Sequence, residues 1–212
     1  NFFGTVASLA VVEDSQAYKV IRSGGYTKGI TTGLTATSDT PALTLVAKDA
    51  DGNIVTGLAI SATSSNTAVI SASTVAEDTV ARDAGYLYGG LGYYNADVTS
   101  AASSTSGQKA TVTYYTVKSD GTTVSATADY SIGGSVAKEV ITLDKATYAP
   151  GEGMIITITA TDSAGNPVYD GKASPAVSFS KAVGGTVPAA STYAAGVVDT
   201  QARSAGVVTN KY

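Results

Sequence analysis

The chain contains no cysteine, no histidine and no tryptophan, and only one methionine. Without cysteine the protein can have neither a disulfide framework nor thiol chemistry. Without histidine it lacks the commonest general base and the commonest transition-metal ligand. These absences exclude catalysis by a thiol or an imidazole, and they make an enzyme the least favoured class of protein.

Charged residues are also scarce. They make up 14% of the chain, against about 25% in an average soluble domain. The net charge is −4 and the basic residues are scattered, so the sequence offers no positive stripe to neutralise phosphates, which argues against nucleic-acid binding. So little charge is typical of a protein that sits against neighbours.

Long apolar runs are missing as well. The longest extends from Val6 to Val12 and is interrupted by Ser8, which is far too short to span a bilayer. The sequence shows neither an initiating methionine nor a signal-peptide pattern, as expected of a fragment or a processed chain. We expect no transmembrane segment in this stretch.

What the chain does contain is an internal repeat. The matching segments, in order, are Gly4–Ala7 with Gly134–Ala137, Asp49–Val55 with Asp162–Val168, and Ala81–Gly85 with Ala202–Gly206. Their offsets are 130, 113 and 121 residues. An unchanged order with drifting offsets is typical of two copies of one domain that differ by loop insertions and deletions.

We therefore expect two domains. Residues 1–3 would be the tail of a preceding domain or a linker, 4–133 the first domain and 134–212 the second. The segment between Gly85 and Gly134 has room for two or three strands, whereas little follows the matching glycine of the second copy. We expect the second domain to lack its last strands here, as in a window on a longer tandem array; completion by a strand of a neighbouring subunit is the alternative.

Composition and alternation predict strands. Thr, Ser, Ala, Gly and Val dominate the sequence, which favours strands and turns over helices. Apolar and polar residues alternate along 43–48, 109–117 and 154–161, the pattern of half-buried antiparallel strands. Turn signals separate such segments at Asp51–Asn53, Lys118–Thr122 and Ala164–Pro167. Short strands divided by tight turns predict an all-β sandwich.

An alternating strand, then Asp-x-x-Gly-Asn-x-Val, then another strand resembles the bacterial immunoglobulin-like repeats of invasin/intimin-type adhesins and surface-layer proteins. Ile156–Val168 is the closest piece, and Tyr148–Gly151 before it also suits the family. The first copy departs by carrying Ile54 where the pattern has proline, and by long loop insertions. The resemblance implies tandem antiparallel immunoglobulin-like β-sandwiches, the second of them incomplete within these residues.

Asp49, Asp51 and Asn53 have the alternating oxygen spacing of a calcium loop. Ile54 stands where such a loop has glycine, and Ile60 where it has glutamate. The alternative is a hairpin in which the first aspartate caps backbone N–H donors, and the residues favour this hairpin. Calcium is the one cofactor that the sequence suggests.

Tyrosines interleaved with glycines make the segment from Gly85 to Asn95 the most unusual of the chain. Rigid, amphipathic rings on an adaptable backbone are typical of interfaces and paratopes. The candidate interface residues are Tyr86, Tyr88, Tyr93 and Tyr94. The alternative is an ordered loop that folds over the edge of its own sandwich, and the sequence does not decide between the two.

A small charged cluster consists of Glu77, Asp78, Arg82 and Asp83. We interpret it as a surface ion pair, not as a catalytic carboxylate pair, because nothing indicates the cleft that paired catalytic acids need. Lys48 and Lys109 could form an isopeptide crosslink only if they were buried beside an asparagine and an acid.

The sequence therefore indicates a structural, extracellular protein. We expect a section of a self-assembling surface-layer lattice, with neighbouring copies as partners and cell-envelope polysaccharide as a further possible partner. One alternative is the spacer or stalk of a bacterial adhesin. Another is an accessory carbohydrate-binding module that uses the Gly/Tyr segment for stacking.

Overall fold

A computed structural model describes residues 4–12, 18–28, 42–78, 90–147, 154–176, 192–194 and 196–201. All regular secondary structure in these ranges is β-strand, and no helix in them is long and apolar enough to cross a membrane. The chain divides into two compact units, Asn1–Ile132 and Gly133–Tyr212. The prediction of an all-β fold is confirmed.

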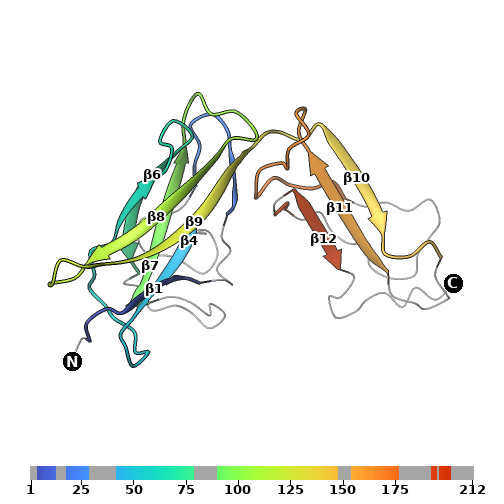
Figure 1. Cartoon of the computed structure of the whole chain (residues 1–212). Helices are drawn as coiled ribbons and strands as arrows, with labels where there is room; N and C mark the ends of the chain where they lie inside the picture. The colour runs from blue at the N-terminus through green and yellow to red at the C-terminus, as the bar shows by residue number, and fades with distance from the viewer. Residues whose placement is uncertain are drawn as a thin grey trace. The chain divides into compact units, whose positions relative to one another are not determined.

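The described strands of the first unit form two sheets (Figure 1). One sheet contains β1 (Ser8–Val11), β4 (Leu43–Lys48), β7 (Tyr93–Ser100), β6 (Ile70–Glu77) and β3 (Thr27–Lys28). The other contains, in order, β2 (Val20–Arg22), β9 (Thr123–Gly133), β8 (Lys109–Val117) and β5 (Ser61–Ser64). The pairs β1–β4, β4–β7, β6–β7, β3–β7, β5–β8 and β8–β9 are antiparallel.

This strand order is that of an immunoglobulin-like sandwich. Such a sandwich places strands A, B, E and D in one sheet and C, F and G in the other. In the first unit β1, β4, β7 and β6 take the positions A, B, E and D, and β5, β8 and β9 take C, F and G. The predicted immunoglobulin-like fold is confirmed by this order.

The core of the first unit lies between the two sheets. Leu43 and Leu45 of β4 belong to one buried cluster with Val112 and Tyr114 of β8, so both sheets contribute to it. With no tryptophan in the chain, buried tyrosines supply the largest side chains. The hydroxyls of Tyr114 and Tyr130 are 3.0 Å apart and hydrogen-bond to each other. Burial raises the pKa of Tyr130 to about 12, so both hydroxyls stay neutral inside the core.

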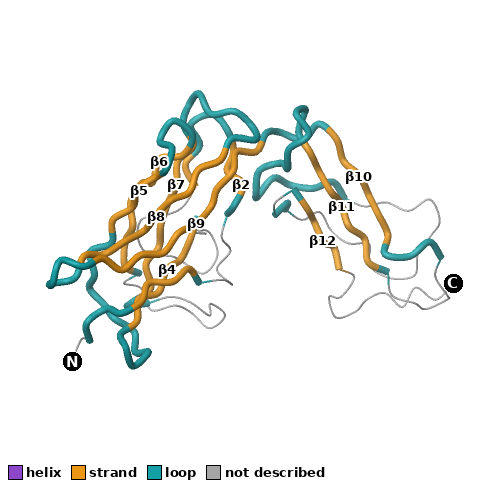
Figure 2. The backbone as a smooth tube through the Cα atoms, viewed as in Figure 1, coloured by secondary structure: helices purple, strands orange, loops and turns teal. Residues whose placement is uncertain are grey.

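The second unit is built on an antiparallel sheet of β10 (Lys138–Leu143), β11 (Ile155–Thr161) and β12 (Val197–Gln201) (Figure 2). Ile156, Ile158 and Ala160 alternate along β11 toward a small core. All six residues of β10 are exposed. The described strands of this unit therefore form one sheet, equivalent to half of a sandwich.

The registers of strand pairing show which residues are equivalent in the two units. Leu9 lies opposite Ala47 in the first unit, and Glu139 lies opposite Ala160 in the second. Glu139 follows Leu9 by 130 residues and Ala160 follows Ala47 by 113 residues, which are the offsets of the first two sequence matches. β12 lies beside β11 as β7 lies beside β4. The repeat seen in the sequence is thus also a repeat of the structure.

The third sequence match does not join equivalent positions. Residues 81–85 precede β7, whereas residues 202–206 follow β12, and these two strands occupy the same place in the two units. Both segments lie outside the described residues. Five residues of similar sequence carry no information about strand pairing, and the registers correct this part of the predicted alignment.

Candidate functional site

The turn after β4 is a hairpin closed by Asp49. Its Oδ1 accepts hydrogen bonds from the backbone N–H of Asp51 at 3.0 Å and of Asn53 at 2.8 Å. Its Oδ2 accepts one from the Asn53 side-chain amide at 3.2 Å. These donors, the Asn53 backbone first, lower the pKa of Asp49. The carboxylate caps backbone donors, as the hairpin interpretation expects.

A calcium ion at this turn would have to compete with those N–H donors for the carboxylate oxygens. Calcium is normally held by six to eight oxygen atoms. Within the described ranges, no group of three or more acidic, histidine or cysteine side chains is placed to hold a metal. The calcium site at Asp49, Asp51 and Asn53 stays a prediction.

The second unit repeats the turn and shows a further contact. Oδ1 of Asp162 accepts two turn amides at 2.9 and 3.0 Å, and its Oδ2 accepts the backbone N–H of Gly134 at 3.1 Å. A Cβ atom on Gly134 would lie 2.7 Å from that oxygen. A Cβ atom on Gly4 would meet the equivalent oxygen of Asp49. The glycine that opens each repeat is therefore required for close approach to the turn.

Two glycines that the sequence analysis missed lie against the other side of the turn. Gly92 and Gly196 have φ angles of 87° and 76°, in the left-handed region. A Cβ atom on Gly92 would meet the side chain of Ile54, and one on Gly196 would lie 2.9 Å from Cβ of Pro167. A glycine directly before an equivalent strand in both copies is the signal that could have found them.

Of the four candidate interface tyrosines, Tyr94 belongs to the core. It is 1% exposed, and its hydroxyl donates to the Val55 carbonyl and accepts the Leu58 N–H, both at 3.1 Å. Burial raises the pKa of Tyr94 to about 12. A side chain so enclosed cannot contact a neighbouring copy, so the structure replaces the interface prediction for Tyr94 with a role in packing. Tyr86 and Tyr88 lie outside the described residues.

The end of the Gly/Tyr segment is held by Glu77. Its carboxylate accepts the backbone N–H of Gly57 at 3.1 Å and that of Gly92 at 2.8 Å. Tyr93 is half-buried at the start of β7, and Leu91 is 62% exposed. The carboxylate thus fixes the last residues of the segment to the rest of the sandwich, while Leu91 faces solvent.

Among the other charged candidates that the structure describes, Asp78 is buried and the two lysines are exposed. Asp78 is 1% exposed, so it is not a surface group, and Arg82 and Asp83 lie outside the described residues. Lys48 and Lys109 are both exposed. The burial that an isopeptide crosslink requires is not met at either lysine.

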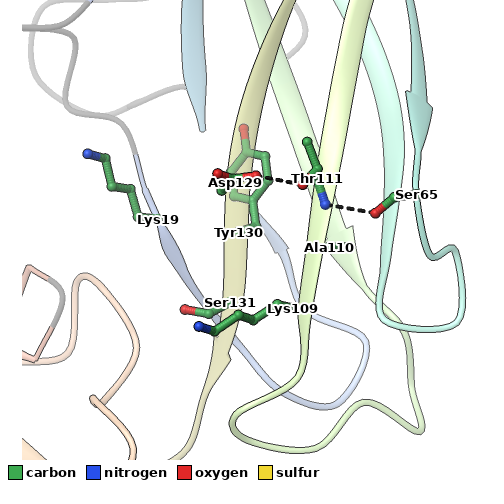
Figure 3. Close-up of a pocket in the computed structure, with 8 residues that line it drawn as sticks. All are labelled: Lys19, Ser65, Lys109, Ala110, Thr111, Asp129, Tyr130 and Ser131. Carbon is green, nitrogen blue, oxygen red and sulfur yellow. Dashed lines mark hydrogen bonds between the residues drawn. The ribbon is translucent and has the colours of Figure 1, made fainter.

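A pocket of about 470 Å³ opens on the outer face of the β2–β9–β8–β5 sheet (Figure 3). Its polar lining residues are Lys19, Ser65, Lys109, Thr111, Asp129 and Ser131. The Thr111 hydroxyl donates to Asp129 Oδ1 at 2.6 Å, and the Thr111 N–H donates to the Ser65 hydroxyl at 2.9 Å. The site could not be predicted from the sequence, because its residues come from four separate segments of the chain.

No family model matches the chain, and no curated protein matches it. Among solved structures, domains 4–9 of the surface layer protein SbsC are 18% identical over 95% of this chain and 28% of that one, with a TM-score of 0.36. The Yersinia pseudotuberculosis adhesin InvE is 16% identical over 92% of this chain and 51% of its own, with a TM-score of 0.35. The Escherichia coli adhesin FdeC is 20% identical over 97% of this chain and 63% of its own, with a TM-score of 0.34. The immunoglobulin-like assignment rests on the strand order of the first unit.

Proposed function

We propose that this chain is a section of a structural protein of the bacterial cell surface, whose tandem immunoglobulin-like domains assemble with neighbouring copies into a surface layer. The observation that carries the proposal is the structural repeat. Each unit has its own sheet with equivalent strand pairing. Each also has the same aspartate-capped turn and the same glycine contacts. Repetition of one scaffold along a chain serves span and assembly.

The polar groups of the described residues support a structural role. Asp49, Asp162 and Glu77 each use their carboxylates to accept backbone N–H groups of turns and loops. Carboxylates used in this way organise the backbone, and their oxygens face N–H donors, not a substrate. An extracellular lattice protein needs such rigid domains and no catalytic centre.

Assembly would proceed through many weak contacts repeated in register, because avidity adds them without requiring a strongly apolar face. We assign the contact surface to the Gly/Tyr segment, with Tyr86, Tyr88 and Tyr93 as its rings. The exposed Leu91 lies within this segment. Glu77 holds Gly92 in place through its N–H, which lowers the entropy that binding would cost at this residue.

An adhesin stalk is the second candidate. The structural repeat supports it as well, because a stalk also repeats one scaffold along the chain. A carbohydrate-binding module that stacks sugars on the Gly/Tyr segment is less well supported, since Tyr94 is buried and cannot stack on a sugar.

Electron microscopy of the purified protein, with and without calcium, tests the proposal. Ordered sheets are expected if the domains form a lattice, and separate rods under both conditions would favour the stalk. The triple variant Tyr86→Ala, Tyr88→Ala and Tyr93→Ala should no longer form the ordered lattice, while the monomer stays folded. Tyr94→Ala is the matched control, because it should destabilise the fold itself. An ordered lattice that still forms in the triple variant would contradict the assigned contact surface.

A further inference from the structure

The pocket on the outer face of the four-stranded sheet is unusual for this chain. Only 14% of the residues are charged, yet two lysines and an aspartate line this one hollow, together with hydroxyl groups. Thr111 and Asp129 point outward because they alternate along their strands with the core residues Ala110 and Tyr130. The polar face is therefore set by strand register.

The register also arranges the pocket internally. Lys109 lies opposite Ser131, and Thr111 lies opposite Asp129, in the β8–β9 ladder. Figure 3 draws both lysines among the residues that line the pocket, with Lys109 on the same strand as Thr111 and Lys19 on a different segment of the chain. Two ammonium groups and one carboxylate give the pocket a net positive charge.

The hydrogen bonds orient the acceptor that lines the pocket. Asp129 is held by the Thr111 hydroxyl, and Thr111 is held through its N–H by Ser65. A carboxylate with two oxygens has further acceptor capacity beyond that one bond. The site therefore offers a fixed acceptor together with cationic donors, a combination that suits a ligand carrying both hydroxyl groups and an anionic group.

We propose that this pocket binds an anionic sugar unit, carboxylated or phosphorylated. Its volume of about 470 Å³ lies within the range of small-molecule sites. Sugar hydroxyls would donate to Asp129, and the anionic group would be met by Lys109 and Ser131. The ring of Tyr130 is 3% exposed and buried in the core, so the pocket provides no aromatic platform for a neutral sugar.

The site goes beyond the proposed structural role and does not depend on lattice formation, because all its residues belong to the first unit. An anionic polysaccharide presents such units in series. One weak pocket per copy, repeated across an array, would bind that polymer through avidity.

Titration of the ¹⁵N-labelled protein, followed by amide chemical shifts, tests the proposal. The probes are a glucuronic acid disaccharide, glucose 6-phosphate and maltose. Shifts confined to residues 109–111 and 129–131 are expected with the first, the second or both, which identifies the anionic group. Equal shifts with maltose, or no localised shift up to about 10 mM ligand, where a millimolar site would be mostly filled, would overturn the proposal.

Two charge-matched variants separate the pocket from general attraction. Lys109→Gln should weaken binding about tenfold, the loss expected for one charge-assisted contact. Lys48→Gln makes the same charge change at an exposed position outside the pocket and should bind as the parent does. Equal weakening by both variants would show non-specific charge attraction and would refute a built site. Both lysines are exposed, so both variants should fold.

Discussion

The two units have the same turn, but their first strands carry different side chains at equivalent positions. Leu9 is 6% exposed and packs in the core of the first unit. The equivalent Glu139 instead accepts a hydrogen bond of 2.6 Å from the Tyr193 hydroxyl. The two units thus share the aspartate-capped turn and its backbone hydrogen bonds. The side chains on the paired strands differ between them.

A second difference concerns what covers the sheet. Val11 packs against the core of the first unit, which the β2–β9–β8–β5 sheet closes. The equivalent Ile141 is 55% exposed, and Leu143 is 47% exposed. The equivalent strands of the two units thus keep the same pairing while their side chains differ in exposure.

The largest expected effect comes from equivalent core truncations. Leu45→Ala in the first unit and Ile158→Ala in the second each remove a side chain that is 0% exposed. Each should lower the free energy of unfolding of its own unit by about 2–5 kcal/mol through lost burial and a cavity. Differential scanning calorimetry should show one transition shifted and the other retained. A shift of both transitions in either variant would show that the units unfold together.

Substitution of the paired glycines should have the next largest effect. Gly92→Ala and Gly196→Ala place a side chain in the left-handed region and against Ile54 or Pro167, with a strain of about 1–3 kcal/mol each. Gly90→Ala is the control, because Gly90 has a φ of 89° and no atom within 4 Å of the added Cβ. Urea unfolding midpoints should fall further for Gly92→Ala than for Gly90→Ala. Equal midpoints for these two variants would contradict the close packing assigned to Gly92.

The aspartate turns predict a pH dependence. The pKa of Asp49 is lowered from its usual 3.8 by N–H donors, so the carboxylate stabilises the fold above that value. This stabilisation should be lost as the pH falls below 3.8 through the lower folded pKa. The melting temperature of Asp49→Asn should vary less with pH in this acid range than that of the parent. Parallel pH profiles would contradict the assigned hydrogen bonds.

Calcium should have the smallest effect, and it sharpens the comparison because the second turn carries Ala164 where the first carries Asp51. Since N–H donors occupy the Asp49 oxygens, we expect the melting temperature to be unchanged by calcium, in the parent and in Asp51→Ala alike. A calcium-dependent rise in the first unit that Asp51→Ala abolishes would establish the metal site.

Much of the fold could be predicted because its signals are local. Alternation marked residues 43–48 and 109–117, which are β4 and β8, and the Asp-Gly-Asn turn indicated the capping role of Asp49. The burial of Tyr94 could not be predicted, because it depends on the pairing of Tyr94 with Leu45 across the sheet. The close approach of Gly92 to Ile54 likewise joins residues that lie far apart in sequence.

The sequence by itself determined the strand class, the turns and the order of the repeated segments, since period-2 alternation and glycine or asparagine at a turn act through neighbouring residues. Only the tertiary structure decided which copies of a motif are equivalent, which tyrosine is buried and which side chains share a pocket. Those properties depend on strand register, and register is set by pairing between segments that lie far apart along the chain.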